Sequence, residues 1–188
     1  EGAAARGIRV DVLDGDTEPR AAGLCVLSDN PHANGYVGDL GGGSLELIRV
    51  ADGKLGERVS LPLGTLRHAV LKGKSTKQIT QMLRDDITAL KGDDGFPVET
   101  GLPFYMIGGS WRTFARLHMH DVGYPLTILS KYQMPPDAPT RLMPLVNDAE
   151  ALAQTKVVAS ARIAALPGAT ALLAGVVRLL EPNELVTS

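Results

Sequence analysis

The sequence predicts an α/β domain in which a mixed sheet with an antiparallel meander carries flanking helices. Residues 36–63 hold three short apolar or alternating segments joined by turn residues, which is typical of antiparallel strands. Strand-like and helix-like segments alternate after them, a pattern that favours a sheet covered by helices. Two glycine-rich connections, 41–43 and 108–109, each follow an expected strand, and we expect both at the same edge of the sheet.

The individual elements follow from periodicity and turn residues. We expect strands at 8–13, 36–40, 44–50, 55–63, 101–107 and 183–187, with one short strand at 125–129. We expect helices at about 18–27, 64–71, 76–91, 111–120, 148–165 and 168–181. Pro167-Gly168 is expected to separate the last two helices. Residues 123–146 hold five of the twelve prolines, so we expect mostly irregular structure there.

Composition fits one globular domain over residues 1–188 and disfavours several classes of partner. The chain is 44% hydrophobic and 21% charged, as in ordinary globular proteins. A net charge of −2 gives no general attraction to nucleic acid or to anionic membranes. No apolar run reaches the roughly 18 residues of a membrane span. The single Cys25 cannot form an intrachain disulfide, which favours a reducing, cytoplasmic compartment, and we expect it to be a small buried apolar residue.

The segment GDLGGGSLEL (38–47) places three consecutive glycines between Asp39 and Glu46. Glycine adopts positive φ cheaply and lets a ligand approach the backbone, and successive free N–H groups form a concave anion site. Ser44 adds a hydroxyl donor. The two acids would repel a bare phosphate, so they suit a Mg²⁺ ion between them and phosphate oxygens, or the positioning of water. A tight hairpin turn with solvated acids is the simpler interpretation.

The second glycine loop, Gly108-Gly109-Ser110, opens the helix expected at 111–120. The N–H groups and dipole of a helix N-terminus attract an anion. Arg112 and Thr113 fall in the first turn and supply further donors. Two such loops facing each other suit a substrate with a chain of phosphates.

Three other features have simpler interpretations. His118, His120 and Asp121 form a candidate metal cluster, but residues two apart do not share a face of a helix, so we interpret them as a helix end. Arg67 is expected to form a structural ion pair. Trp111 is expected to be a packed anchor beside the second glycine loop, with a position lining the substrate channel as the alternative.

Several motifs together resemble one known family. Asp39–Glu46 fits the signature Asp-hydrophobic-Gly-Gly-Gly-Ser-x-Glu at every position, and with SLPLGTLRH (60–68) it resembles the exopolyphosphatase and guanosine pentaphosphate phosphohydrolase (Ppx/GppA) phosphatase family. MIGGSWRTFA (106–115) resembles the family's second glycine loop, and residues 165–188 its closing helix and strand. LDGDTEPRAAGLCVLS (13–28) resembles, more loosely, its Ser-Gly-x-Glu-Glu-Ala-Arg segment.

The resemblance implies the RNase H-like fold of actin, sugar kinases and heat-shock-70-type ATPases. It also implies that residues 1–188 correspond to the second domain of a two-domain enzyme. Nothing in the chain matches the family's first phosphate loop or its Gly-x-Arg-Glu-Gly segment. We therefore expect an N-terminal domain and a C-terminal end outside this chain, with that domain as a partner, and an isolated chain that is inactive. The sequence does not decide whether the chain forms a homodimer.

The resemblance further implies hydrolysis of phosphoanhydride bonds with Mg²⁺, releasing terminal phosphate from inorganic polyphosphate or from guanosine pentaphosphate (pppGpp). Glu18 takes the place of the family's catalytic glutamate and would orient or deprotonate the attacking water, while Asp39 and Glu46 would hold the metal. The expected phosphate-binding residues are Gly41, Gly42, Gly43, Ser44, Gly108, Gly109, Ser110, Arg112 and Thr113. The alternatives are a kinase or ATPase of the same fold, and a catalytically silent phosphate-binding domain.

Overall fold

A computed structural model describes residues 6–7, 17–92 and 95–188 of the chain. Its centre is a six-stranded sheet in the order β3-β2-β1-β4-β6-β5. Strands β1, β4 and β6 are mutually parallel, whereas β2, β3 and β5 run antiparallel to their neighbours. The strands are β1 (Gly35–Leu40), β2 (Leu45–Ala51), β3 (Lys54–Leu61), β4 (Phe104–Ile107), β5 (Gln133–Met134) and β6 (Leu185–Thr187). The predicted mixed sheet and its antiparallel meander are confirmed; the strand expected at 8–13 lies outside the described residues.

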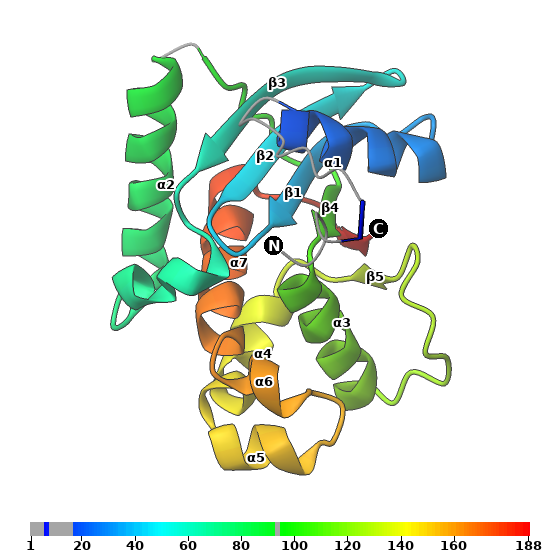
Figure 1. The fold of residues 1–188 in the computed structure, drawn as a ribbon, viewed down its shortest axis with the longest axis vertical. Helices are drawn as coiled ribbons and strands as arrows, with labels where there is room; N and C mark the ends of the chain where they lie inside the picture. Colours follow the sequence, from blue (N-terminus) through cyan, green and yellow to red (C-terminus); the bar gives the residue numbers. More distant parts are fainter. Residues whose placement is uncertain (1–5, 8–16, 93–94) are drawn as a thin grey trace.

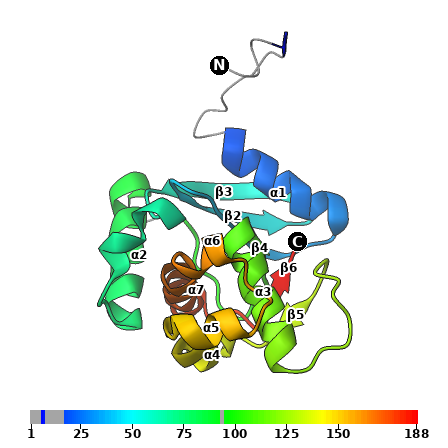
Figure 2. The ribbon, with the colours of Figure 1, turned by 60° about the horizontal axis from the view of Figure 1, so that its bottom comes forward.

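Helix α1 (Thr17–Asp29) covers one face of the sheet, while the remaining helices lie on the other side (Figures 1 and 2). Ala22 and Val26 of α1 pack with Val37 and Ile48 in a small apolar core. Cys25 is exposed, which contradicts its expected burial. Adjacent helix positions are about 100° apart around the axis, so the rotation that buries Val26 turns Cys25 toward solvent.

The larger core fills the opposite face, and helix α7 (Leu166–Leu180) lies at its centre. It contacts α2 (Thr76–Lys91), α3 (Gly109–Asp121), α4 (Ala138–Asn147) and the 3-10 helix η2 (Thr65–Leu71). Gly175 allows α2 and α7 to approach closely, because a Cβ there would lie 2.5 Å from Ile79 Cγ2. The Thr80 hydroxyl of α2 donates to the Gly175 carbonyl at 3.2 Å. None of the helices in the described segments has both the length and the apolar character needed to cross a membrane.

The proline-rich segment 123–146 is only partly irregular, which corrects the sequence expectation. Helix α4 begins at Ala138, and the short strand is β5, which pairs with β6, rather than a strand at 125–129. Pro139 falls in the first turn of α4, where the missing N–H has no helical partner to lose. Pro144 lies in the helix interior. The carbonyl that its missing N–H leaves unpaired belongs to Thr140, an exposed residue, and water can satisfy it.

The helix expected at 148–165 is two short helices, α5 (Ala149–Gln154) and α6 (Ser160–Ile163). Lys156, between them, has φ of 58°, and neither glycine nor proline marks this break in the sequence. Pro167-Gly168 does not separate two helices as expected, because both residues lie in the first turn of α7. Proline is tolerated at that position.

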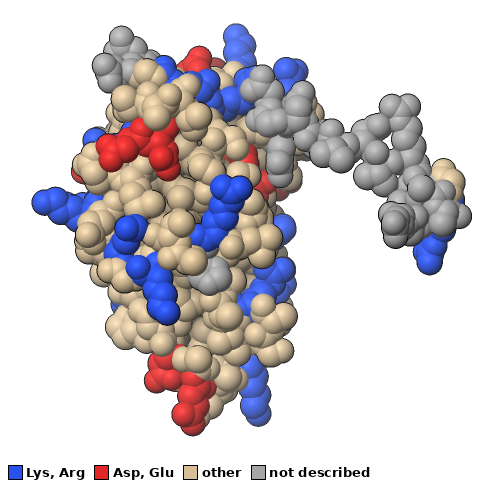
Figure 3. Space-filling view, turned by 60° about the vertical axis from the view of Figure 1, so that its left-hand side comes forward, with Lys and Arg blue, Asp and Glu red and all other residues tan. Residues whose placement is uncertain are grey.

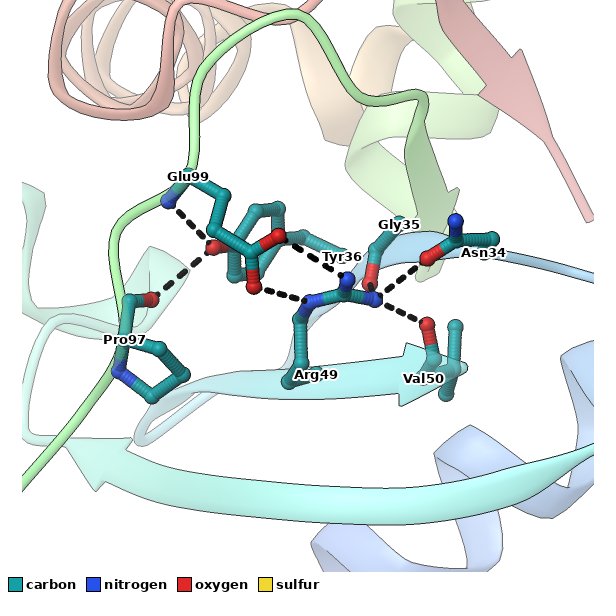
Figure 4. A network of polar contacts seen from close by, with 7 residues as sticks. All are labelled: Asn34, Gly35, Tyr36, Arg49, Val50, Pro97 and Glu99. Carbon is teal, nitrogen blue, oxygen red and sulfur yellow. Dashed lines mark hydrogen bonds and ion pairs between the residues drawn. The ribbon is translucent and has the colours of Figure 1, made fainter. Parts of the chain in front are cut away.

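A polar network at the start of β1 ties the segment before β4 to the sheet (Figure 4). The Arg49 guanidinium bonds both carboxylate oxygens of Glu99, with Nε 3.2 Å from Oε1, and also the side chain of Asn34 at 2.8 Å. The Tyr36 hydroxyl accepts from the Glu99 amide at 2.7 Å and donates to the Pro97 carbonyl at 2.9 Å. This network lies at the end of β1 opposite to its glycine loop, so we assign it a structural role.

His118 and His120 fall in the last turn of α3 but lie on different sides of it. His118 is 4% exposed, and its Nδ1 lies 2.7 Å from the Tyr132 hydroxyl, whereas His120 is exposed. Within the described residues no three His, Cys, Asp or Glu side chains are arranged to hold a metal. Burial lowers the pKa of His118, and Arg141 lowers it further, while Asp121 and Asp137 act in the opposite direction.

The depressed pKa of His118 makes stability depend on pH. The unfolded chain binds this proton near pH 6.5 and the folded chain only at lower pH, so the stabilisation is complete above about pH 6.5 and is lost as pH falls below it. His118→Gln should therefore reduce the decline of the melting temperature between about pH 7 and pH 5. His120→Gln, at an exposed position, is the control and should keep the wild-type profile. Identical profiles for His118→Gln and wild type would contradict the assignment.

Candidate active site

The loop Gly41–Ser44, between β1 and β2, rests on the chain segment Gly64–Leu66 that begins η2. The carbonyls of three consecutive glycines each accept a hydrogen bond from this segment. The pairs are Thr65 N–H to Gly41, Leu66 N–H to Gly42 and Gly64 N–H to Gly43, with N···O distances of 3.0, 2.8 and 3.2 Å. The loop itself is closed by the Gly41 N–H, which donates to the Ser44 carbonyl at 3.0 Å.

These bonds decide which way the loop amides face. In a trans peptide the C=O and the following N–H point in opposite directions, and no described peptide is cis. With the three carbonyls held by Gly64–Leu66, the N–H groups of Gly42, Gly43 and Ser44 point away from η2. None of the three donates a hydrogen bond to another described residue. The loop therefore presents three consecutive, outward-facing donors.

The reasons for glycine differ from one position to another. None of Gly41, Gly42 and Gly43 has positive φ, so the expected conformational reason does not apply. Gly64 is required by close contact, because a Cβ there would lie 2.3 Å from the Gly42 carbonyl oxygen. A Cβ on Gly43 would meet nothing within 4 Å. The space over Gly43 is open, as it must be if a ligand is to reach the amides.

The second glycine loop lies next to the first. Strands β1 and β4 are parallel neighbours, with Asp39 opposite Ile107, so the connections that follow them share one edge of the sheet. Gly108 precedes α3 with φ of 101°. A Cβ on Gly108 would lie 2.5 Å from the Leu40 carbonyl oxygen, so this position needs glycine for both its conformation and its close contact with β1. The predicted adjacency of the two loops is confirmed.

Arg162, which the sequence analysis did not single out, lies beside the second loop. A Cβ on Gly109 would lie 2.6 Å from Arg162 Nη1 and 2.7 Å from Nη2, which places the guanidinium against the first turn of α3. Arg162 forms no ion pair with another described residue. A cation at the positive end of a helix dipole is unfavourable by itself. The arrangement becomes favourable when an anion lies between the guanidinium and the helix amides.

The predicted residues of the first turn of α3 differ in their accessibility. Arg112 is exposed, whereas Ser110 and Thr113 are buried. The Thr113 hydroxyl donates to the Gly109 carbonyl at 2.8 Å, so the structure does not present it to a ligand. Trp111 is fully buried, which confirms the predicted packed anchor beside the second glycine loop, and its Nε1 donates to the Ala169 carbonyl of α7 at 3.0 Å.

Asp39 and Glu46 lie directly opposite each other on β1 and β2. Both share the sheet face of Val37 and Ile48, which α1 covers, because side chains alternate along a strand. Glu46 is 1% exposed, and its Oε1 accepts from the Ser60 hydroxyl at 3.0 Å. Two opposed carboxylates repel each other, whereas Mg²⁺ is commonly held by one or two carboxylates together with phosphate oxygens. The donor set therefore fits this ion.

Glu18 is the second residue of α1, and its side chain lies outside what the structure describes. Helix α1 ends at Asp29, shortly before β1 begins at Gly35, and it contacts all three strands of the meander. The helix therefore runs back across the sheet, on the face of Asp39 and Glu46, with its first turn toward the end of β1 (Figure 1).

The parallel strands, the meander and the two glycine loops at one sheet edge define an α/β domain of the actin-like class. The sequence profile of the Ppx/GppA phosphatase family matches residues 3–188, and the chain belongs to this family. A search of curated proteins found no match.

Solved structures of this family resemble the chain in fold. An Aquifex aeolicus Ppx/GppA family member has a TM-score of 0.76 and 21% identity, over 99% of this chain and 62% of that one. The type II variant of the Aquifex aeolicus Ppx/GppA phosphatase has a TM-score of 0.75 and 20% identity, over 99% and 63%. An exopolyphosphatase from Cytophaga hutchinsonii ATCC 33406 has a TM-score of 0.76 and 16% identity, over 96% and 62%. The chain thus spans about three fifths of the length of each.

The contact between Gly64 and the first glycine loop yields a stability prediction. Gly64→Ala forces a Cβ into the backbone of the loop and should destabilise the fold by about 1–3 kcal/mol. Gly43→Ala, which enters open space, should change the free energy of unfolding by less than about 0.5 kcal/mol. Urea denaturation of both variants measures the difference. Equal losses would show that the loop does not depend on Gly64 for its position.

Proposed function

We propose that this chain forms the phosphate-binding part of a hydrolase that releases terminal phosphate from a phosphoanhydride chain. The observation that carries the proposal is the set of outward-facing amides of Gly42–Ser44 next to the first turn of α3 and Arg162. Membership of the Ppx/GppA phosphatase family supports it, as does the likeness to a protein described as an exopolyphosphatase. The substrates we propose are inorganic polyphosphate or pppGpp, in a cytoplasmic protein.

The proposed chemistry relies on positioning and on charge. Transfer of a phosphoryl group to water spreads negative charge over its three equatorial oxygens. The amides of Gly42–Ser44 and the guanidinium of Arg162 would meet that charge. Because the loop carbonyls are already bonded to Gly64–Leu66, the amides need not reorganise as the reaction proceeds. The exposed Arg112 is a further donor at the same helix end.

Asp39 and Glu46 would hold Mg²⁺ at this edge of the sheet. When bound, this ion would neutralise phosphate oxygens and reduce the repulsion between substrate and carboxylates. Ser60 would keep the Glu46 carboxylate in place through its hydrogen bond to Oε1.

Glu18 is the proposed general base. It would accept a proton from the attacking water as the water oxygen bonds the terminal phosphorus. The bond from that phosphorus to the bridging oxygen breaks, which releases orthophosphate and leaves the bridging oxygen as the new end of a chain shorter by one phosphate. A second domain, as the family resemblance implies, would supply the rest of the cleft.

The proposed function is tested by phosphate release from long-chain polyphosphate and from pppGpp with Mg²⁺. The assay compares the 188-residue chain with the full product of its gene, because the chain spans 62% of the matched Aquifex aeolicus structure. We expect turnover by the full product and none by the isolated chain. Glu18→Gln in the full product should reduce turnover by at least about a hundredfold, with substrate affinity little changed. Wild-type turnover in this variant would refute the role of Glu18, and no release from either substrate would refute the function.

Arg162 should contribute to phosphate affinity. Arg162→Ala should weaken binding of tripolyphosphate by about tenfold, in line with the loss of one charge-assisted hydrogen bond. Arg162→Lys keeps the charge but loses the planar set of N–H donors of the guanidinium. Its affinity should therefore fall between those of the wild type and Arg162→Ala. Isothermal titration calorimetry of the chain measures the affinities. Arg116→Ala, at an exposed position two turns into α3, is the matched control and should bind as wild type does; an equal loss there would indicate a general charge effect.

A further inference from the structure

A cavity of about 740 Å³ lies between the start of α2, helix α4 and the start of α7. Its walls include Lys72, Lys74 and Asn147, and the lysines are the only charged residues that line it within the described chain. We call this cavity the lysine pocket. Neither lysine forms an ion pair with another described residue. The pocket therefore carries positive charge that the fold does not neutralise.

Two elements connect the lysine pocket to the candidate active site. Helix η2 bonds the first glycine loop through Thr65 and Leu66 and ends directly before Lys72. Helix α6 places Arg162 against the second glycine loop, and two residues later Ala164 lines the pocket. Seven residues of 3-10 helix span about 14 Å. Lys72 at the edge of the pocket therefore lies about 14 Å along η2 from Thr65, which bonds the first glycine loop.

Charge is unevenly distributed over the face of the molecule that Figure 3 turns forward. In Figure 3, Lys and Arg side chains are spread across the middle of the face turned forward, and Asp and Glu gather toward its upper left and its bottom. The first turn of α2 does not supply free donors at its N-cap, because Ser75 and Gln78 bond each other in a capping box. The charged groups available for recognition in the pocket are the two lysines, and the Asn147 amide is a neutral partner.

We propose that the lysine pocket binds phosphate groups of the substrate that are remote from the one released. These are internal phosphates of polyphosphate, or the 3′-diphosphate of pppGpp. The inference rests on the proposed function and names a second contact region for the same substrates. A chain of phosphates carries negative charge along its whole length, so a protein that binds only its end leaves the remainder uncompensated. Lys72 and Lys74 supply that compensation, whereas tripolyphosphate ends before it reaches them.

The test uses charge reversal in the 188-residue chain. Lys72→Glu/Lys74→Glu is titrated with long-chain polyphosphate, pppGpp and tripolyphosphate, and affinities are measured at several salt concentrations. We expect at least about tenfold weaker binding of one or both long ligands and less than twofold change for tripolyphosphate. The salt dependence of long-ligand affinity should also become shallower, because fewer cationic contacts form. Loss for polyphosphate alone identifies internal phosphates as the occupant, and loss for pppGpp identifies its 3′-diphosphate.

The matched control is Lys54→Glu/Lys131→Glu, which makes the same change in net charge at exposed lysines that do not line the pocket. If charge reversal disturbs folding, the test is repeated with Lys72→Gln/Lys74→Gln. The proposal is overturned if the control loses as much affinity, or if neither pocket variant discriminates long ligands from tripolyphosphate. Phosphate release by the full gene product is measured separately: its absence overturns the proposed function, whereas normal release with unchanged affinity in the pocket variants overturns the lysine pocket alone.

Discussion

The candidate site depends on one contact: the hydrogen bonds that hold the first glycine loop against Gly64–Leu66. Three carbonyls are held on one side, and three amides are consequently presented on the other. The contact requires glycine at position 64, because a side chain would enter the loop backbone. The amides are thereby fixed by the fold before any ligand arrives, which is the condition under which backbone donors stabilise developing charge most effectively.

The sheet topology places everything else around that contact. The antiparallel meander brings η2 back beneath the β1–β2 loop, and the parallel pairing of β1 with β4 brings Gly108 against Leu40. Phe104 and Trp111 pack edge to face, with ring centroids 5.6 Å apart, over Gly38. Since Trp111 also bonds the carbonyl of Ala169, the first turn of α3 is tied to α7 and hence to the larger core.

The sequence is sufficient to predict features that depend on local sequence pattern. It is insufficient to predict features that depend on tertiary contacts. The meander, the helix at 76–91 and the adjacency of the glycine loops follow from periodicity and turn residues. Helix α4 was missed because its prolines fall where the fold tolerates them, and the α5–α6 break because Lys156 adopts positive φ without a glycine. Arg162 was missed because its contact with Gly109 joins two helices that are far apart in the chain. The role of Gly64 is visible only as a distance between segments far apart in the chain.

The distribution of charge explains why these features belong to one site. Arg162 lies beside a helix N-terminus, where a cation alone is unfavourable, and the exposed Lys72 and Lys74 add positive charge to a neighbouring cavity. Asp39 and Glu46, whose charges have the opposite sign, lie opposite each other on the sheet face covered by α1. The first set of charges attracts an anion and the second set repels it, and a metal ion alone has the reverse preference. A phosphate chain accompanied by a divalent cation is complementary to both sets, and for this reason we propose that the glycine loops, the acids and the lysine pocket contact a single extended ligand.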